Sequence, residues 1–83
     1  MSYTQVNAKA DRRVTTLSAW SAARIESEEL YALARNVSDA GAKFMRLFAE
    51  VLLARDPGTQ ERFFEALEYR EQAKYNETMK IYA

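Results

Sequence analysis

The chain has 83 residues, with 12 basic and 12 acidic side chains, and it contains neither cysteine nor histidine. This length suits one domain at most, and the balanced charge excludes a global electrostatic field that would attract nucleic acid. The missing residue types are those most often used for proton transfer, metal binding and nucleophilic attack near neutral pH. We therefore expect no enzymatic activity, no cofactor, no metal site and no disulfide framework.

Helix-breaking residues are scarce. The chain has two glycines and one proline, and Pro57 and Gly58 are adjacent, so that Gly41 alone is left to interrupt the rest. Nearly half of the residues are apolar, 48%, which favours a folded domain over a disordered one. The sequence therefore predicts a single all-α domain over residues 1–83, a small bundle of three to four helices with a long C-terminal helical hairpin.

The first segment, about Thr4 to Arg24, is predicted to be helical. Its apolar residues recur at steps of three and four, which places them on one face of a helix. Thr15 and Thr16 are weak helix formers, so packing of that face has to hold the helix. We expect Trp20, at the end of the stripe, to pack in the core. The stripe consists of Val6, Ala10, Val14, Leu17 and Trp20.

A second helix is predicted to begin at Ser27. The hydroxyl group of Ser27 can cap a free N–H, and Glu28 and Glu29 lie in the favourable field of the first turn. Residues 22–24 are strong helix formers, so the chain either bends at Ser27 or continues from the first segment, and we favour a bend. Tyr31 is expected to pack in the core. The predicted buried side consists of Leu30, Leu33, Ala34 and Val37.

The third helix, predicted from Ala40 to Arg55, has the widest apolar face. Such an arc needs neighbours on more than one side, which indicates the central helix of a bundle or half of an oligomer interface. We expect the chain to be a homo-oligomer that associates through Phe44, Phe48 and Leu52, or through the aromatic residues near the end of the last helix. The apolar residues of this helix are Phe44, Met45, Leu47, Phe48, Val51, Leu52 and Leu53.

A last helix is predicted from the turn at Asp56–Thr59 to about Tyr82, antiparallel to the third. Asp56 can cap it, and Pro57 suits the first helical position. Its apolar residues form two patches, separated by Arg70, Glu71 and Lys74. We expect one patch to dock on the bundle and the other on a second body. The first patch is Phe63, Phe64 and Leu67, and the second is Tyr75, Met79, Ile81 and Tyr82.

The last helix also carries the residues that we assign to a partner. Glu61, Glu65 and Glu68 recur at steps of four and three, which suits an acidic stripe facing a basic partner, a set of carboxylates for a divalent ion or a solvated face. Aromatic rings in the polar part of the helix are best explained as contacts to another chain. The predicted partner-binding residues are Glu61, Glu65, Glu68, Tyr69, Tyr75, Met79 and Tyr82.

An alternative interpretation is a small DNA-binding regulator. Residues 29–48 carry a weak helix-turn-helix-like pattern, in which Ala32 and Asn36 lie four apart before a Val-Ser turn. Arg35 departs from the pattern, and the would-be recognition helix begins with small residues that reach few base edges. The phosphate contacts would come from Arg12, Arg13, Arg35, Lys43 and Arg46.

Three basic residues, Lys9, Arg12 and Arg13, also cluster on one side of the first segment. Three charges neutralise few phosphates, so we do not expect nucleic acid to be the partner, and whether the cluster contacts phosphate stays open.

No membrane or export segment is expected. The first ten residues lack the apolar core of a secretory signal, and the longest apolar stretch, Leu47–Ala54, is far shorter than the roughly 20 residues that span a bilayer. The predicted location is the cytoplasm. The composition, the helices and the exposed aromatic residues together predict a small protein-binding helical module, an adaptor, assembly subunit or inhibitor that occupies the surface of another protein.

Overall fold

The computed structural model describes residues 3–82, and the fold of these residues is all-α, without strands. The helices are α1 (Tyr3–Thr16), α2 (Ala19–Ala22), α3 (Ser27–Asn36), α4 (Asp39–Val51) and α5 (Pro57–Tyr82). The predicted class, a small helical bundle, is confirmed. Two of the predicted segments differ from the expectation: the first is divided into α1 and α2, and the third ends at Val51 instead of Arg55.

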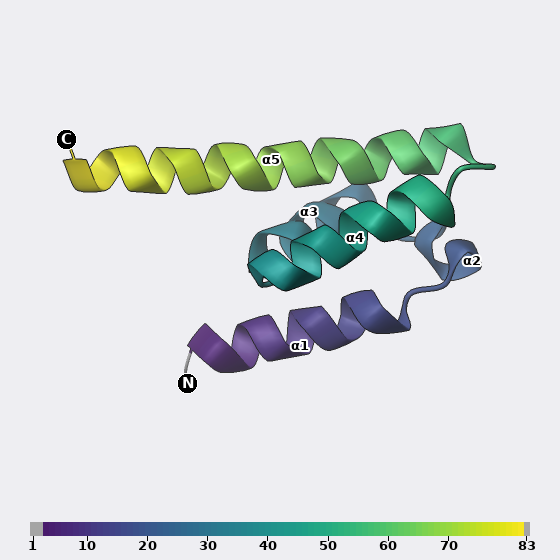
Figure 1. The fold of residues 1–83 in the computed structure, drawn as a ribbon, viewed down its shortest axis with the longest axis horizontal. Helices are drawn as coiled ribbons and strands as arrows, with labels where there is room; N and C mark the ends of the chain where they lie inside the picture. Colours follow the sequence, from purple (N-terminus) through teal and green to yellow (C-terminus); the bar gives the residue numbers. More distant parts are fainter. Residues whose placement is uncertain (1–2, 83) are drawn as a thin grey trace.

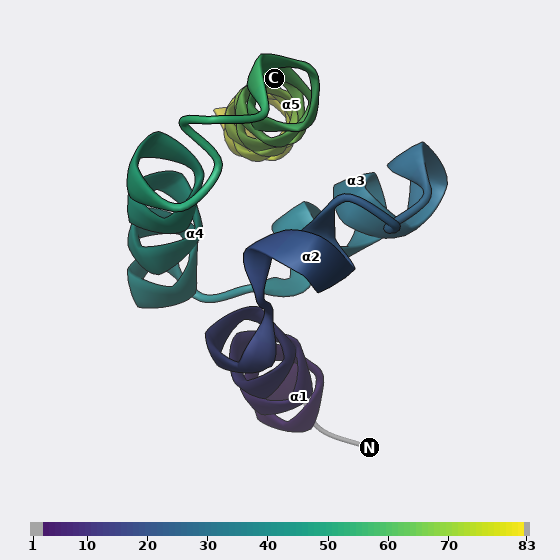
Figure 2. The ribbon, with the colours of Figure 1, turned by 90° about the vertical axis from the view of Figure 1, so that its right-hand side faces the viewer.

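The helices enclose one core, with α3 and α4 placed between α1 and α5. Figure 2 shows this arrangement end-on, and Figure 1 shows α4 and α5 running antiparallel on either side of their short connection. Helix α5 packs on both α3 and α4, and α1 packs on the same two helices from the other side. The molecule measures 43 × 25 × 20 Å. The longest dimension follows α5, whose C-terminal half extends past α3 and α4 (Figure 1).

The first predicted helix ends early, at Thr16. The hydroxyl groups of Thr15 and Thr16 donate to the carbonyls of Arg12 and Arg13, at 2.9 and 3.0 Å. Ser18 then has extended backbone angles, and its hydroxyl oxygen accepts from the N–H of Ser21 to cap α2. Hydroxyl side chains of this kind compete with the helical backbone and favour caps. The chain therefore turns twice before α3, whereas we expected one bend at Ser27.

Helix α3 begins at the predicted place, with a different cap. Glu26 takes the extended N-cap position without a side-chain hydrogen bond, and Ser27 is the first helical residue. Glu28 and Glu29 lie in the first turn as expected. The buried side of α3 is as predicted: Leu30, Leu33 and Ala34, followed by Val37.

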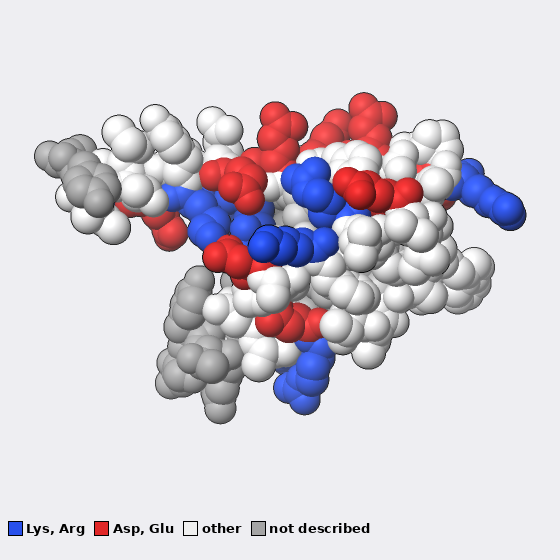
Figure 3. All heavy atoms as spheres, viewed as in Figure 1, with Lys and Arg blue, Asp and Glu red and all other residues white. Residues whose placement is uncertain are grey.

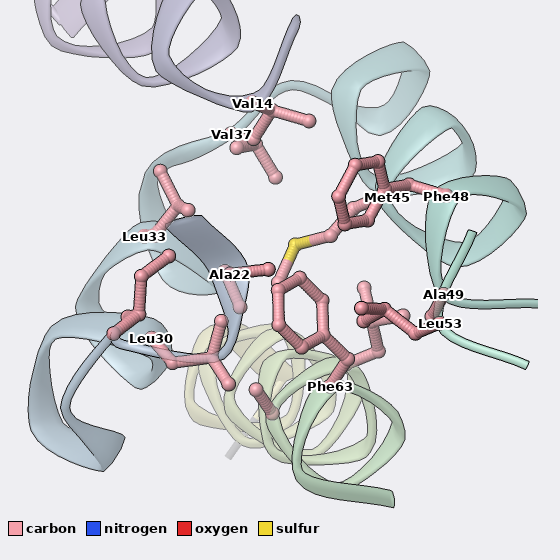
Figure 4. Packing of buried hydrophobic residues seen from close by; sticks show 14 of the residues in the cluster. Val14, Ala22, Leu30, Leu33, Val37, Met45, Phe48, Ala49, Leu53 and Phe63 are labelled. Carbon is pink, nitrogen blue, oxygen red and sulfur yellow. The ribbon is translucent and has the colours of Figure 1, made fainter. Parts of the chain in front are cut away.

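The core joins side chains from every helix (Figure 4). Phe63 of α5 is fully buried at its centre, and its ring stacks on that of Phe48 of α4, with 5.8 Å between the ring centroids. Met45 of α4 and Leu30 of α3 are also fully buried. The first half of α5 thus docks on the bundle, as its apolar pattern predicts.

Helix α1 is held to the connection between α3 and α4 by a polar contact. The carboxylate of Asp11 accepts a hydrogen bond from the backbone N–H of Ser38 at 2.9 Å, and the hydroxyl oxygen of Ser38 accepts from the N–H of Gly41 at 3.0 Å. Gly41 is buried directly beneath the Asp11 carboxylate. The close approach of α1 to α4 therefore requires a residue without a side chain at position 41.

The start of α5 is capped as predicted. Asp56 accepts from the hydroxyl of Thr59 at 2.7 Å and from its backbone N–H at 3.3 Å, and these two bonds lower the pKa of Asp56. The side chains that follow reach other parts of the bundle: Gln60 donates to the carbonyl of Ala49 of α4 at 3.1 Å, and Arg62 donates to the carbonyl of Ile25 in the connection between α2 and α3. The first turns of α5 are thus fixed by hydrogen bonds as well as by apolar contacts.

Candidate protein-binding surfaces

Helix α5 presents one continuous stripe on the side that faces away from the core. The stripe residues recur at steps of four and three, and a helix turns by 100° per residue, so they lie about 180° from Phe63 and Arg70 on the buried side. Its described side chains are all exposed. Figure 3 shows acidic side chains along this outer edge of α5. The stripe consists of Glu61, Glu65, Glu68, Gln72, Tyr75, Met79 and Tyr82.

The stripe changes character along the helix. Its first three residues are acidic, and beyond Gln72 come Tyr75 and Met79, which are 62% and 48% exposed. Ile81, on the opposite side of the helix, is 80% exposed because α5 has by then passed the end of the bundle (Figure 1). The side chain of Tyr82 lies outside the described residues. The projecting half of α5 therefore carries apolar groups that the described residues leave uncovered.

Tyr69, the remaining predicted partner residue, lies beside the stripe. Its ring stacks on that of Tyr31 of α3, at a centroid separation of 5.1 Å and an interplanar angle of 11°. Tyr31 is half-buried, in line with the expected packing role, and Tyr69 is partly exposed. The main role of Tyr69 in the isolated chain is thus to join α5 to α3.

The charged residues that separate the two apolar patches form a junction between three segments. Arg70 of α5 is buried despite its charge. Its guanidinium group donates to the carbonyl of Val37 at 3.3 Å and to the carboxylate of Asp39 at 2.7 Å. Lys74 donates to the same oxygen of Asp39 at 2.6 Å. The carboxylate of Asp39 also lies at the positive N-terminus of α4. This junction anchors α5 at the point where its projecting half begins.

The junction predicts a loss of stability in acid. The hydrogen bond from Arg70, followed by that from Lys74, lowers the pKa of Asp39 from 3.8 to about 2. A lowered carboxyl pKa contributes stability that is complete above the unfolded-state pKa, near pH 4, and is lost as the pH falls to about 2. We expect the thermal midpoint, followed by circular dichroism, to fall less steeply over this range in Asp39→Asn than in the native chain. Equal slopes would contradict the role of Asp39.

Helix α4 exposes a second apolar surface. Phe44, Leu47 and Val51 are 43%, 59% and 62% exposed, and Leu52 after them is also exposed. Phe48, which we assigned to self-association with Phe44 and Leu52, instead lies in the core against Phe63. Its position, 100° from Leu47 around the helix, turns it toward α5. The exposed α4 face is thus made by Leu47 and Val51 in place of Phe48, and self-association stays a prediction.

Trp20 does not pack in the core. The break at Ser18 removes it from the stripe that continues α1, and its side chain is 67% exposed. The guanidinium carbon of Arg24 lies 3.5 Å from the centroid of the indole ring, a cation–π contact. The expected core position is therefore wrong, because it assumed one uninterrupted helix from Thr4 to Arg24.

The basic cluster of α1 lies at a groove between α1 and α3. Lys9, Arg12 and Arg13 are exposed there, and the groove has a volume of about 640 Å³ with Ala32 and Leu33 on its α3 side. Arg13 is paired with Glu29 of α3 at 3.1 Å. One of the three charges is thus already engaged within the chain.

The structure places the helix-turn-helix-like segment on α3 and α4. In that motif the N-terminal residues of the second helix contact base edges. Here Gly41 is buried against Asp11 of α1, and Asp39 is held by Arg70 and Lys74 of α5. Positions 39 and 41 at the start of α4 are therefore already engaged by α5 and α1 of the same chain, an arrangement that does not favour reading of a groove.

No protein-family model matches the chain, and searches of curated proteins and of solved structures find no similar protein. Among the described residues, no group of three or more acidic side chains is arranged to hold a metal ion. Over the same residues, no helix combines the length and apolarity needed to cross a bilayer. The candidate surfaces are therefore assigned from the structure of this chain alone.

Proposed function

We propose that this protein is a small helical module that binds another protein through the outward stripe of α5. The observation that carries the proposal is the exposure of Tyr75 and Met79 on a helical segment that extends beyond the bundle. Aromatic and methionine side chains are enriched in the cores of protein interfaces. A helix that carries apolar anchors at steps of three and four suits an apolar groove on a partner.

The acidic part of the stripe supports a particular kind of partner. Glu61, Glu65 and Glu68 lie on the same side of α5 as the anchors, nearer the bundle, and all three are exposed. Charges of one sign at the rim of an interface accelerate association with a surface of the opposite sign and contribute less to its final affinity. The partner should therefore offer an apolar groove with basic residues at one end. An adaptor, an assembly subunit and an inhibitor all act in this way.

The proposal predicts that the anchors can be removed without loss of the fold. In Tyr75→Ala with Met79→Ala, alanine preserves the helix, and neither native side chain belongs to the core. We expect unchanged helicity and at least about a tenfold loss of affinity, since each interface anchor contributes on the order of 1 kcal/mol or more. The matched control is Thr78→Ala with Lys80→Ala, which changes exposed residues on the flanks of the stripe.

The partner would be captured from an extract of the cells that produce the protein and identified by quantitative mass spectrometry. A protein retained by the native chain and by the control, but not by the anchor variant, supports the proposal, and its affinity is then measured with purified components. If no protein shows this difference, the proposal fails. Binding to duplex DNA that weakens steeply with added salt would favour the DNA-binding interpretation instead.

A further inference from the structure

The exposed face of α4 has the spacing of a helix-pairing seam. Ala40, Phe44, Leu47 and Val51 follow one another at steps of four, three and four, as in the a and d positions of a coiled coil. All four are exposed, the last three to between 43% and 62%. Gly41, Met45 and Phe48, also at steps of four and three, are buried on the other side of the helix. Helix α4 therefore has two apolar sides, and the described part of the chain covers one of them.

The two edges of this seam differ in charge. Lys43 and Glu50 are seven residues apart, about two turns, so they lie on the same edge of the seam. Both are exposed, and among residues 3–82 neither has an ion-pair partner. On the other edge lies Phe48, which is buried in the core. One edge thus carries a positive and a negative charge at opposite ends, and the other offers no charge.

We propose that a second copy of the chain covers this face, with the two α4 helices antiparallel. A two-fold axis across the seam near Leu47 places Phe44 of each copy opposite Val51 of the other. It also brings the charged edges together, so that Lys43 of each copy faces Glu50 of the other and two ion pairs form. A parallel pair would set the charged edge against the edge of Phe48 and leave both charges unpaired. Charge complementarity therefore selects the antiparallel arrangement.

The area involved indicates a weak dimer. Phe44, Leu47 and Val51 expose on the order of 300 Å² per chain, comparable to the largest apolar patch of a typical monomer. Two copies of these side chains bury about 600 Å², well below the roughly 1,200 Å² at which specific interfaces begin, so the flanking side chains must contribute as well. The dimer should therefore dissociate on dilution. The outward stripe of α5 lies elsewhere on the molecule, so this inference and the proposed function do not depend on each other.

Light scattering behind size exclusion, over a wide range of concentrations, tests the dimer directly. We expect the native chain to pass from dimer to monomer on dilution, and Leu47→Glu to be monomeric throughout because it places a carboxylate on the two-fold axis. Ala32→Glu, which adds the same charge at an exposed position of α3, should behave as the native chain does. Circular dichroism checks that both variants are folded. A native chain that is monomeric at its highest soluble concentration, or a Leu47→Glu variant that still dimerises, overturns the proposal.

Charge reversal tests the orientation. Lys43→Glu alone and Glu50→Lys alone each replace two attractions by two repulsions, and we expect the dissociation constant to rise about tenfold in either variant. The combined variant restores both pairs with their signs exchanged and should dimerise as the native chain does. Unchanged dimerisation of the single variants would exclude the antiparallel pairing.

Cysteine cross-linking gives an independent readout, because the native chain has no cysteine. Under mild oxidation, a mixture of Phe44→Cys and Val51→Cys should form a disulfide between the two variants in preference to either variant with itself. Preferential self-linkage of each variant would mean a parallel arrangement and would overturn the proposal.

Discussion

Replacing Phe63 with alanine is expected to remove a large part of the stability of this protein. Phe63 is fully buried, and its ring contacts the α4 side of the core through Phe48. Removing a buried phenylalanine ring costs about 3–5 kcal/mol, from lost burial and from the cavity left behind. A domain of this length has a total unfolding free energy of roughly 4–12 kcal/mol. Chemical denaturation followed by circular dichroism should therefore show a large shift of the midpoint, or a chain already unfolded without denaturant.

The adjacent Phe64 provides the matched control. It has the same side chain at the next position of α5 and is only partly buried. Phe64→Ala should lower the free energy of unfolding by less than half the cost of Phe63→Ala. Similar losses for the two variants would show that the two rings share the core, and the described orientation of α5 would then be wrong.

The second large effect is expected at Gly41. A methyl group there would meet the carboxylate of Asp11 and would lie 3.1 Å from the Cβ of Val37. The carboxylate cannot move aside freely, because it accepts the hydrogen bond from the N–H of Ser38. Alanine normally stabilises a helix relative to glycine by about 1 kcal/mol, but here overpacking costs about 1–3 kcal/mol and the broken bond about 1 kcal/mol. We expect Gly41→Ala to lower the free energy of unfolding by about 2 kcal/mol.

A double-mutant cycle separates this clash from a general effect on α4. Asp11→Ala removes the carboxylate and its hydrogen bond, so the single variant should also be less stable. In the combined variant the methyl group at position 41 no longer meets a carboxylate. The loss of unfolding free energy in the combined variant should therefore be smaller than the sum of the losses in the two single variants. Strict additivity, measured by the same denaturation experiment, would show that Asp11 is not what makes glycine necessary.

The fold was predictable where apolar spacing and caps agree. Leu30 and Leu33 on α3, and the Asp56–Pro57 start of α5, were expected from the pattern, and the structure places them accordingly. The division of the first segment was not expected, because the periodic stripe from Val6 to Trp20 outweighed the three hydroxyl residues between positions 15 and 18. Those hydroxyl groups bond to nearby backbone, and such local competition is invisible to a periodicity argument.

In the candidate surfaces, too, features that depend on neighbouring residues could be predicted, and features that depend on residues far away in the sequence could not. The exposed side of α5 could be assigned from the sequence, since a helix has one side toward the core and one away from it. The role of Arg70 could not, because it depends on a carbonyl 33 residues earlier in the chain. A signal was nevertheless present: Arg70 lies three and seven residues after Leu67 and Phe63, on the buried side of α5. A long basic side chain at such a position can bury its stem while its head finds acceptors at the edge of the core.

The wide apolar arc of α4 could be recognised in the sequence, but its division into two sides could not. Phe44, Leu47 and Phe48 are equally apolar, and only the positions of α1, α3 and α5 decide which of them remain uncovered. Phe48 turns toward Phe63 and the other two do not. The residues exposed on a helix that is apolar on both sides are thus a property of the packed bundle.

The outward stripe of α5 also limits the shape of whatever binds it. Residues seven apart on a straight helix are displaced by about 20° around its axis, so a stripe of three such intervals, from Glu61 to Tyr82, winds through about 60°. A flat, straight surface would follow the acidic end or the aromatic end, but not both. A partner that contacts the full stripe must itself coil with a left-handed sense, as a helix in a coiled coil does, or present a groove twisted in that sense.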